Sequence, residues 1–379
     1  MEHHDDGKTM IIELKKDADS AQSKEDDVTL THSSLFPVKP KKSSFFRNPT
    51  FLAGILLLLL VIAVLLLVSS IGDEQTPAET TGAEITDTPP EGTDTPPIRP
   101  VGSFYVTGLT EAEQIGGVSS SFALLTEADS LTALAQKNAN EKMYPASLTK
   151  IMTFLVAYDA LSDRLDKQLT LTHEIKSTYS DGSRVGIDEG DLLTVEQCMY
   201  ATILESDTDA VLMLVKEAAG TEAAFVELMN EKAKELELTA THFTNANGLH
   251  HDDHYTTPVE IAVIFAKALQ NELFRTILTA ETYVTFLGYY KDGVYTTYRM
   301  TFSNSTLVKR FADNGISTEL SNGVTVIGGK TGYTPEAKSC QAALAVDEDG
   351  KEYIAILGHA STAKSCASDT AYVYRNYIK

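Results

Sequence analysis

The sequence is short of basic residues. Its 379 residues include 31 lysines and arginines against 53 aspartates and glutamates, which gives a formal net charge of -22 at pH 7. A nucleic-acid partner needs a basic face, so this balance argues against nucleic-acid binding. Hydrophobic residues make up 43% of the chain and charged residues 22%. That composition is ordinary for a globular protein.

Cysteine is also scarce, at positions 198, 340 and 366 only. An odd number leaves at least one thiol unpaired. Cys198 falls on the apolar face of an expected helix, which favours a small core residue. Cys340 and Cys366 flank a C-terminal hairpin. A disulfide between them stays open, because a sequence cannot establish the required geometry.

One long stretch lacks charge altogether. Phe51–Val68 is 18 uncharged residues, and Ser69–Ile71 extends it to the length of a bilayer span. A cleaved secretory signal would lie nearer the N-terminus and end in a small-residue cleavage site, so the pattern favours an uncleaved anchor. Four basic residues precede the run, and two acids follow it. The positive-inside rule therefore predicts a single-pass cell-membrane protein with a cytoplasmic N-terminus and everything after about residue 72 outside.

The chain divides into four expected regions. Residues 1–50 read as a disordered cytoplasmic tail and residues 51–71 as a transmembrane helix. Residues 72–103 repeat TDTPP, which is typical of an extended linker. Residues 104–379 have strand patterns at both ends and helical patterns between them. This order predicts an α+β domain with one mainly antiparallel sheet flanked by helices.

Several elements of that domain are specified locally. Apolar residues at helical spacing predict a helix over 147–161, and Thr221 is placed to cap a later amphipathic helix. An Asp349–Gly350 pair predicts a hairpin turn between two late strands. A final helix is expected near the C-terminus.

The stretch MYPASLTKIMT places Ser147 three residues before Lys150. Positions i and i+3 share a helix face, so a partly desolvated Lys150 amine could take the proton of the Ser147 hydroxyl. Taken alone, the motif favours the plainer interpretation of a helix-capping serine with a solvent-facing lysine. The sequence even carries a second Ser-x-x-Lys, at Ser361–Lys364.

Two further stretches change this balance. Ser206 lies between two apolar helical runs, and Lys330-Thr331-Gly332 follows a strand rich in β-branched residues. On an edge strand, Lys330 and Thr331 could meet a carboxylate, while Gly332 lets a substrate backbone approach. Ser-x-x-Lys, a second serine about 60 residues later and a late Lys-Thr-Gly form the ordered signature of penicillin-recognising serine enzymes.

Residues 104–379 resemble the D-alanyl-D-alanine carboxypeptidase family, the low-molecular-weight penicillin-binding proteins. The resemblance rests on four stretches in the right order: YPASLTKIMT, GSRVGIDEGDLLTVEQCMYATILESDTDA, FTNANGLHHDDHYTTPVEIAVIFAKAL and GGKTGYTPEAKSC. It implies a β-lactamase/DD-peptidase-like fold. It also implies that peptidoglycan stem peptides are the substrates and β-lactam antibiotics the inhibitors, and it implies neither a cofactor nor a metal.

The resemblance also implies roles for individual residues. Ser147 would attack the carbonyl between two terminal D-alanines, with Lys150 as general base. Ser206 would hydrogen-bond Lys150 and relay the proton to the leaving amine. The backbone N–H groups of Ser147 and Tyr333 would form the oxyanion hole.

The late Lys330-Thr331-Gly332 motif would bind the substrate. Lys330 and Thr331 would hold the terminal carboxylate, beside Gly332 and Tyr333. Thr208 takes the place of the usual asparagine of the second motif, where its single hydroxyl would give a weaker contact to the substrate carbonyl.

Two other departures from the family pattern stand out. Asn247 replaces a histidine, and we expect no catalytic role for it. The C-terminal β-rich domain and amphipathic anchor of many members have no counterpart here, and the N-terminal apolar segment would replace that anchor.

A metal site is the competing interpretation of HHDDH at His250–His254. Two histidines four residues apart with carboxylates could bind zinc. The sequence offers neither a third ligand cluster nor HExxH, so a polar loop is the preferred interpretation.

Two other functions stay open. A class A β-lactamase would fit Ser-Asp-x and Lys-Thr-Gly, but the Glu-x-x-Leu-Asn stretch that supplies its deacylating glutamate is not found after Ser206. A weakly catalytic or non-catalytic wall-binding or β-lactam-sensing domain is slightly favoured by Thr208 and the long cytoplasmic tail. The sequence does not decide between carboxypeptidase and endopeptidase action.

Overall fold

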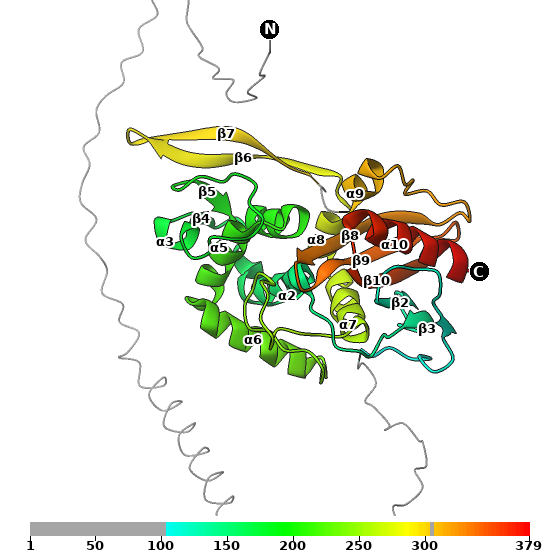
Figure 1. Ribbon diagram of the computed structural model, residues 1–379. Helices are drawn as coiled ribbons and strands as arrows, with labels where there is room; N and C mark the ends of the chain where they lie inside the picture. Colours follow the sequence, from blue (N-terminus) through cyan, green and yellow to red (C-terminus); the bar gives the residue numbers. More distant parts are fainter. Residues whose placement is uncertain (1–103, 304–306) are drawn as a thin grey trace, which may run out of the picture. The chain divides into compact units, whose positions relative to one another are not determined.

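The computed structural model describes residues 104–303 and 307–379 (Figure 1). The expected tail, transmembrane helix and linker, residues 1–103, lie outside the described residues. Within the described part of the chain, no helix is both long and apolar enough to cross a membrane.

A six-stranded sheet in the order β1-β3-β2-β10-β9-β8 organises the domain. All neighbours are antiparallel except β1 and β3. The expected α+β class with a mainly antiparallel sheet is therefore confirmed. The strands are β1 (Glu113–Gln114), β2 (Phe122–Glu127), β3 (Ala133–Lys137), β8 (Thr325–Thr334), β9 (Lys338–Val346) and β10 (Glu352–Ala360).

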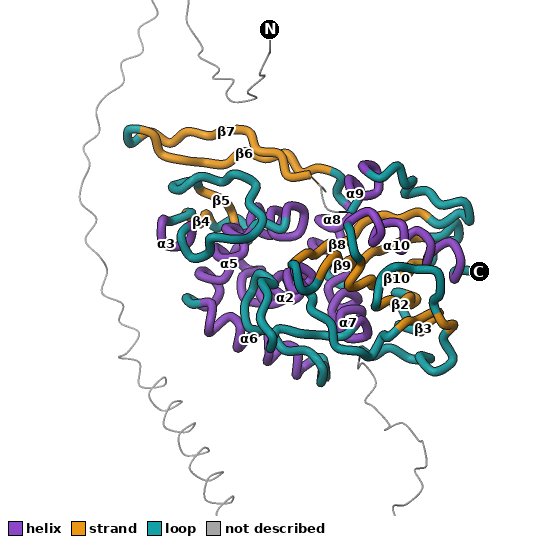
Figure 2. The backbone as a smooth tube through the Cα atoms, in the orientation of Figure 1, coloured by secondary structure: helices purple, strands orange, loops and turns teal. Residues whose placement is uncertain are grey.

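Both faces of this sheet are apolar, because consecutive strand residues point to opposite sides. Leu124 and Ile356 pack into the core that contains the central helices. Leu125 and Leu357, their chain neighbours, pack into a second core with the C-terminal helix. The sheet is thus buried between two helical layers. In Figure 2, the helices α3 (His173–Lys176), α5 (Thr208–Ala219) and α6 (Glu222–Glu235) gather on one side of the sheet, away from α10 (Ala363–Tyr377).

The helices surround this sheet and carry clear start signals. Thr221 caps α6 as expected, because its side chain accepts a hydrogen bond from the Ala224 N–H at 3.2 Å. The expected helix at 147–161 begins at Thr149 and follows a 3₁₀ turn, Ala146–Leu148. The helices are α2 (Thr149–Leu161), α3 (His173–Lys176), α4 (Val195–Tyr200), α5 (Thr208–Ala219), α6 (Glu222–Glu235), α7 (Pro258–Leu269), α8 (Glu272–Thr279), α9 (Val308–Asp313) and α10 (Ala363–Tyr377).

A second sheet, in the order β4-β5-β6-β7, was not expected from the sequence. Its strands are β4 (Gln168–Thr170), β5 (Leu192–Thr194), β6 (Thr282–Lys291) and β7 (Val294–Ser303), and the last two form the long hairpin of Figure 1. The hairpin turns at Asp292 and Gly293, with φ angles of 51° and 80°. A two-residue hairpin turn of this type needs a positive φ at both positions, which Asp-Gly tolerates. The Asp-Gly pair is therefore a strong sequence signal, and this hairpin was predictable.

The three cysteines are buried free thiols. Cys198 lies in the core, in agreement with the sequence-based interpretation. The Cys340–Cys366 disulfide left open by the sequence is not formed. Cys340 instead contacts the Ala337 carbonyl oxygen at 3.4 Å, and burial raises the pKa of its thiol to about 11.

A close backbone contact joins two loops of the fold. A Cβ on Gly248 would lie 1.9 Å from the Ala146 carbonyl oxygen, and Gly248 itself has a φ of +79°. The short distance and the positive φ both require glycine here. A Cβ atom would collide with the Ala146 backbone, and residues with a side chain rarely adopt a left-handed conformation. Gly350 has a similar φ of +82° but open space around it, so it isolates the conformational part of the effect.

We predict that Gly248→Ala destabilises the protein more than Gly350→Ala. The Gly350 variant should lose about 1 kcal/mol, the cost of a left-handed alanine. The Gly248 variant should lose about 3 kcal/mol or more, because the backbone must also move. Thermal unfolding of the two full-length variants measures the difference, and equal losses would show that the contact is easily relaxed.

Candidate active site

Ser147 lies in the 3₁₀ turn Ala146–Leu148, directly before α2. The turn is strained, because Ala146 has a φ of 47° in the left-handed region. The Ala146 carbonyl accepts a hydrogen bond from the Thr149 hydroxyl at 2.8 Å. This hydrogen bond holds the turn that orients the Ser147 side chain.

Lys150 follows one turn later and is 98% buried. Its Nζ lies 3.4 Å from Ser147 Oγ and donates a hydrogen bond to the Asn247 carbonyl oxygen at 2.7 Å. Burial lowers the pKa of Lys150 to about 7, although the nearby Asp207 carboxylate opposes the shift. A large fraction of the amine is therefore neutral near neutral pH, as a base for the serine proton must be.

The carbonyl that holds Lys150 belongs to a loop built around Asn245. The Asn245 side-chain oxygen accepts backbone hydrogen bonds from Asn247, Gly248 and Leu249 at 2.7–3.1 Å. Asn247, for which we expect no catalytic role, has a structural one: its backbone carbonyl positions Lys150, and its side chain lines the same cleft.

Ser206 ends a π-helical turn, Ala201–Glu205, and adopts a left-handed conformation with a φ of 58°. π-Turns of this kind are frequent at functional sites. Its side chain lines the cleft, and its Oγ is buried without a hydrogen-bond partner. The expected Ser206–Lys150 hydrogen bond is therefore not formed in this structure, because Lys150 donates to the Asn247 carbonyl instead.

Asp207 and Thr208 are clamped by the loop before β5. The Asp207 carboxylate accepts from the N–H groups of Ala210 and Val185, both at 2.7 Å, and the Thr208 N–H donates to the Ser183 carbonyl oxygen at 2.9 Å. Burial raises the pKa of Asp207 to about 6, against the effect of those two hydrogen bonds. No local sequence pattern indicates the contacts with Val185 and Ser183, because they join segments more than 20 residues apart.

The Thr208 hydroxyl fits closely against Gly182. A Cβ at Gly182 would lie 2.3 Å from Thr208 Oγ1, so the two positions are matched in size. The hydroxyl is buried without a hydrogen-bond partner, as are both polar atoms of the Asn247 side chain. Buried polar atoms usually have partners, so this wall of the cleft offers unused hydrogen-bonding capacity.

Strand β8 forms the opposite wall and is an edge strand of its sheet, as expected. A Cβ at Gly332 would lie 2.9 Å from the Ser147 nitrogen and 3.0 Å from the Pro145 carbonyl oxygen. Gly332 thus lets the strand approach the serine turn, whereas the sequence analysis expected it to make room for substrate. Tyr333 is 62% exposed at the rim.

Lys330 lies behind the wall of the cleft. Its side chain is fully buried, and its Nζ donates to the Thr331 carbonyl oxygen at 3.0 Å. Thr331 lines the cleft, but Lys330 does not. The contact of Lys330 with a substrate carboxylate stays a prediction.

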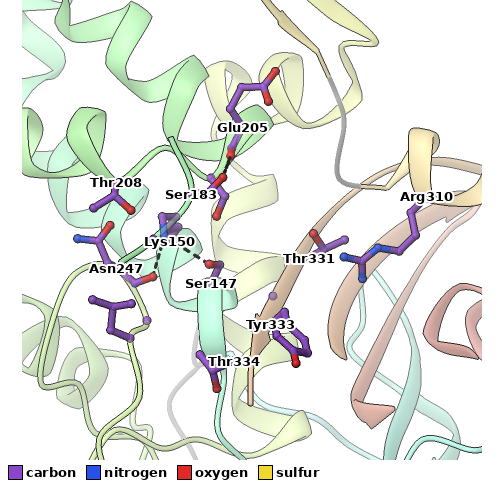
Figure 3. Close-up of a pocket in the computed structure, with 15 residues that line it drawn as sticks. Ser147, Lys150, Ser183, Glu205, Thr208, Asn247, Arg310, Thr331, Tyr333 and Thr334 are labelled. Carbon is purple, nitrogen blue, oxygen red and sulfur yellow. Dashed lines mark hydrogen bonds between the residues drawn. The ribbon is translucent and has the colours of Figure 1, made fainter. Parts of the chain in front are cut away.

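The residues converge on one cleft of about 240 Å³. Figure 3 shows Ser147 between Lys150 on one side and Thr331 and Arg310 on the other. Arg310 was missed by the sequence analysis, since one cation on a short helix gives no signal. The lining residues are Ser147, Lys150, Gly182, Ser183, Glu205, Ser206, Thr208, Asn247, Gly248, Leu249, Arg310, Thr331, Gly332, Tyr333 and Thr334.

The competing motifs have structural explanations. Ser361 and Lys364 lie at the start of α10 and do not line the cleft. His254 is buried, and its Nε2 lies 2.8 Å from the Thr149 hydroxyl. Burial lowers the pKa of His254 to about 3, so it is neutral. Among the described residues, no group of three or more potential ligand residues could hold a metal ion.

Comparison with known proteins places the same region in one family. Residues 109–362 match the family described as D-alanyl-D-alanine carboxypeptidase (Peptidase_S11). The chain is 32% identical over 248 residues to D-alanyl-D-alanine carboxypeptidase DacF of Bacillus subtilis, covering 64% of this chain and 58% of DacF. It is 31% identical over 258 residues to a Streptomyces strain K15 D-alanyl-D-alanine carboxypeptidase, covering 65% of this chain and 82% of that protein.

A solved structure supports the match. The crystal structure of the Streptomyces K15 DD-transpeptidase aligns with a TM-score of 0.61 and 26% identity. The alignment covers 69% of this chain and 97% of the other. The two chains thus share a fold over 69% of this chain.

We predict that the reaction of Ser147 with a fluorescent penicillin depends on the neutral form of Lys150. The acylation rate constant should rise with pH, with a midpoint near the Lys150 pKa of about 7. Below that midpoint it should fall about tenfold per pH unit, because each unit reduces the neutral fraction tenfold. Stopped gel-fluorescence time courses measure the rate, and a flat profile across this range would refute Lys150 as the base.

Proposed function

This chain belongs to the D-alanyl-D-alanine carboxypeptidase family, and on that premise we propose that it removes the terminal D-alanine from peptidoglycan stem peptides. The observation that carries the proposal is the Ser147–Lys150 pair. A serine at a helix start faces a buried lysine whose pKa is about 7, in a cleft walled by an edge strand. The reaction class is acyl transfer through a serine ester.

The acylation step follows from the positions of these groups. Neutral Lys150 takes the Ser147 proton while Ser147 Oγ attacks the carbonyl carbon between the two D-alanines. Negative charge develops on the carbonyl oxygen, and we assign the backbone N–H groups of Ser147 and Tyr333 to it. The close approach of β8 to the serine turn at Gly332 supports this pairing of the two N–H groups.

Collapse of the intermediate breaks the peptide bond and releases D-alanine. The leaving nitrogen needs a proton, which we assign to Lys150 with Ser206 as a relay. The partnerless Ser206 hydroxyl is available for that contact once substrate enters. Water then hydrolyses the ester, which frees Ser147. β-Lactam antibiotics would acylate the same serine and act as inhibitors.

The β-lactamase alternative finds little support in the cleft. Glu205 is the one acidic residue among those lining it, and its carboxylate accepts hydrogen bonds from the N–H and hydroxyl of Ser303. It is therefore held toward β7, and Figure 3 shows its carboxylate pointing away from Ser147. A deacylating glutamate would need to face the water that attacks an acyl-Ser147.

We extend the proposal to the location of the enzyme. The uncharged segment 51–71 with basic residues before it supports a single membrane anchor. Residues 1–50 would then be cytoplasmic, and the linker 72–103 would carry the catalytic domain outside the membrane to the cell wall. Protease added to intact cells or spheroplasts would test this arrangement by removing the domain and leaving the tail.

The direct test uses mass spectrometry of a stem pentapeptide incubated with the full chain. The expected result is loss of one D-alanine, abolished in Ser147→Ala and unaffected in Ser361→Ala, the serine of the second Ser-x-x-Lys. Penicillin labelling without release of D-alanine would instead support a sensing domain. Cleavage of crosslinked peptides only would support an endopeptidase.

We predict that Thr208→Val separates a binding role of the Thr208 hydroxyl from a structural one. Valine keeps the shape that fits Gly182 but removes the hydroxyl. If that hydroxyl contacts substrate, kcat/KM should fall about two- to tenfold, the worth of one neutral hydrogen bond. Unchanged kcat/KM together with higher thermal stability would assign Thr208 to packing alone.

A further inference from the structure

The β6–β7 hairpin exposes aromatic side chains on one of its two faces (Figure 1). Consecutive strand residues point to opposite faces, and Leu287 and Phe302, which share the inner face, are fully buried. On the outer face, Phe286 and Tyr290 are 62% and 66% exposed, and Tyr295, the cross-strand partner of Tyr290, is 47% exposed. Aromatic groups gathered on a surface in this way mark a binding site.

The Tyr295 ring has a defined position on this face. A Cβ at Gly288 would lie 2.4 Å from Tyr295 Oη and 2.7 Å from its Cε2. The tyrosine therefore fills the space that a side chain at 288 would take, and its ring runs along the sheet. Its Oη accepts a hydrogen bond from Gln168 Nε2 on β4 at 3.2 Å. The outer surface of the ring is thus held ready to stack against a ligand.

Tyr290 adds a second surface at an angle to the first. The centroids of the Tyr290 and Tyr295 rings lie 5.6 Å apart, and their planes meet at 67°. One ring lies along the sheet and the other crosses it, so the pair forms an aromatic corner. A rigid ring-shaped ligand can rest on Tyr295 with its edge against Tyr290.

The neighbouring row on β7 is polar. Thr297 and Arg299 are exposed and pair with Gly288 and Phe286 across the two strands. An aromatic row beside a row of hydrogen-bond donors suits a sugar, whose ring presents C–H groups on its faces and hydroxyl groups at its edge. A lipid surface would instead favour an apolar face without such a polar row.

The hairpin also differs in charge from the chain as a whole. The formal net charge of the chain is -22, yet residues 282–303 contain Lys291 and Arg299 against Asp292 alone. The stem peptides of the proposed substrate end in carboxylates, which an acidic surface repels. The hairpin is a surface that an anionic wall polymer can approach.

The hairpin is continuous with the catalytic cleft. The N–H and hydroxyl of Ser303, the last residue of β7, donate to Glu205, which lines the cleft. At about 3.4 Å per strand residue, Arg299 and Tyr295 lie about 14 Å and 27 Å along β7 from Ser303. An extended stem pentapeptide reaches about 17 Å, so a glycan carrying a peptide in the cleft is within range of this row.

We propose that the outer face of the β6–β7 hairpin binds the glycan strand of peptidoglycan, with a sugar ring stacked on Tyr295 against Tyr290. Thr297 and Arg299 would donate hydrogen bonds to hydroxyl and acetamido oxygens. The inference rests on the proposed function, which supplies the wall polymer, and it adds a binding site outside the cleft. Such a site raises the local concentration of stem peptides without taking part in the chemistry.

Glycan strands stripped of their stem peptides by an amidase test this site independently of the cleft. Fluorescence anisotropy of end-labelled strands gives their Kd for the full chain. Tyr295→Ala should raise this Kd about three- to tenfold, the worth of one stacked ring. Tyr295→Phe keeps the ring and should bind nearly as the wild type does. Tyr372→Ala removes an exposed tyrosine of α10 as a matched control and should leave the Kd unchanged.

Release of D-alanine should separate along the same line. Tyr295→Ala should keep the wild-type kcat/KM on a soluble pentapeptide and lose about three- to tenfold on sacculi that carry pentapeptides. The proposal is overturned if wild type and Tyr295→Ala bind stripped glycan equally, or if neither binds it. It is also overturned if Tyr295→Ala loses binding to lipid vesicles, or self-association, while its glycan binding is unchanged.

The soluble pentapeptide keeps this result distinct from the proposed function. A wild-type enzyme that binds stripped glycan but releases no D-alanine from the pentapeptide would refute the proposed function and support the glycan site. A wild-type enzyme that releases D-alanine but does not bind stripped glycan would do the reverse.

Discussion

The active site depends on the enclosure of one amine. Lys150 is removed from water by its own helix and by the loop at Asn247, and it keeps a single short hydrogen bond to a backbone carbonyl. A carbonyl oxygen accepts a stronger hydrogen bond from the ammonium than from the neutral amine, but it does not neutralise the charge as a carboxylate would. Desolvation therefore dominates, and the pKa of the lysine falls to about 7.

The rest of the local fold maintains that enclosure. Asn245 shapes the loop that supplies the carbonyl, and Gly248 lets the loop press against the strained turn at Ala146. On the other side, Gly332 lets β8 approach the serine backbone. The two glycine contacts bring backbone against backbone, where a methyl group would not fit. The site is thus rigid before substrate arrives, which is what stabilisation of a developing oxyanion requires.

Sequence reasoning anticipated the parts of this site that are encoded locally. The Ser147–Lys150 spacing defined a shared helix face, and the Lys330-Thr331-Gly332 stretch defined an edge strand. Prediction from the sequence failed where the function depends on contacts between segments that are distant along the chain. Nothing near Asn247 indicates that its carbonyl will meet Lys150, 97 residues away. Nothing in the Lys330-Thr331-Gly332 stretch indicates that the Lys330 side chain is fully buried.

Arg310 and the β6–β7 hairpin show two different kinds of omission. Arg310 could not be assigned from sequence, because only the packing of α9 brings its guanidinium to the cleft. The hairpin could have been predicted, since Asp292-Gly293 is flanked by strand-forming residues. The transmembrane segment and linker stay predictions, because they lie outside the described residues. Fold class was the easiest inference, because strand patterns at both ends of residues 104–379 with helical patterns between them predict an α+β domain.

The most direct test of the central claim is a titration of the Lys150 amine itself in the free enzyme. NMR of the full chain with isotope-labelled lysine can follow each side chain with pH, and the signal that disappears in Lys150→Met identifies the residue. Our account predicts a midpoint near pH 7 for that signal. A midpoint above about pH 10, the ordinary value for lysine, would contradict it, because Ser147 would then face an ammonium ion that cannot accept its proton.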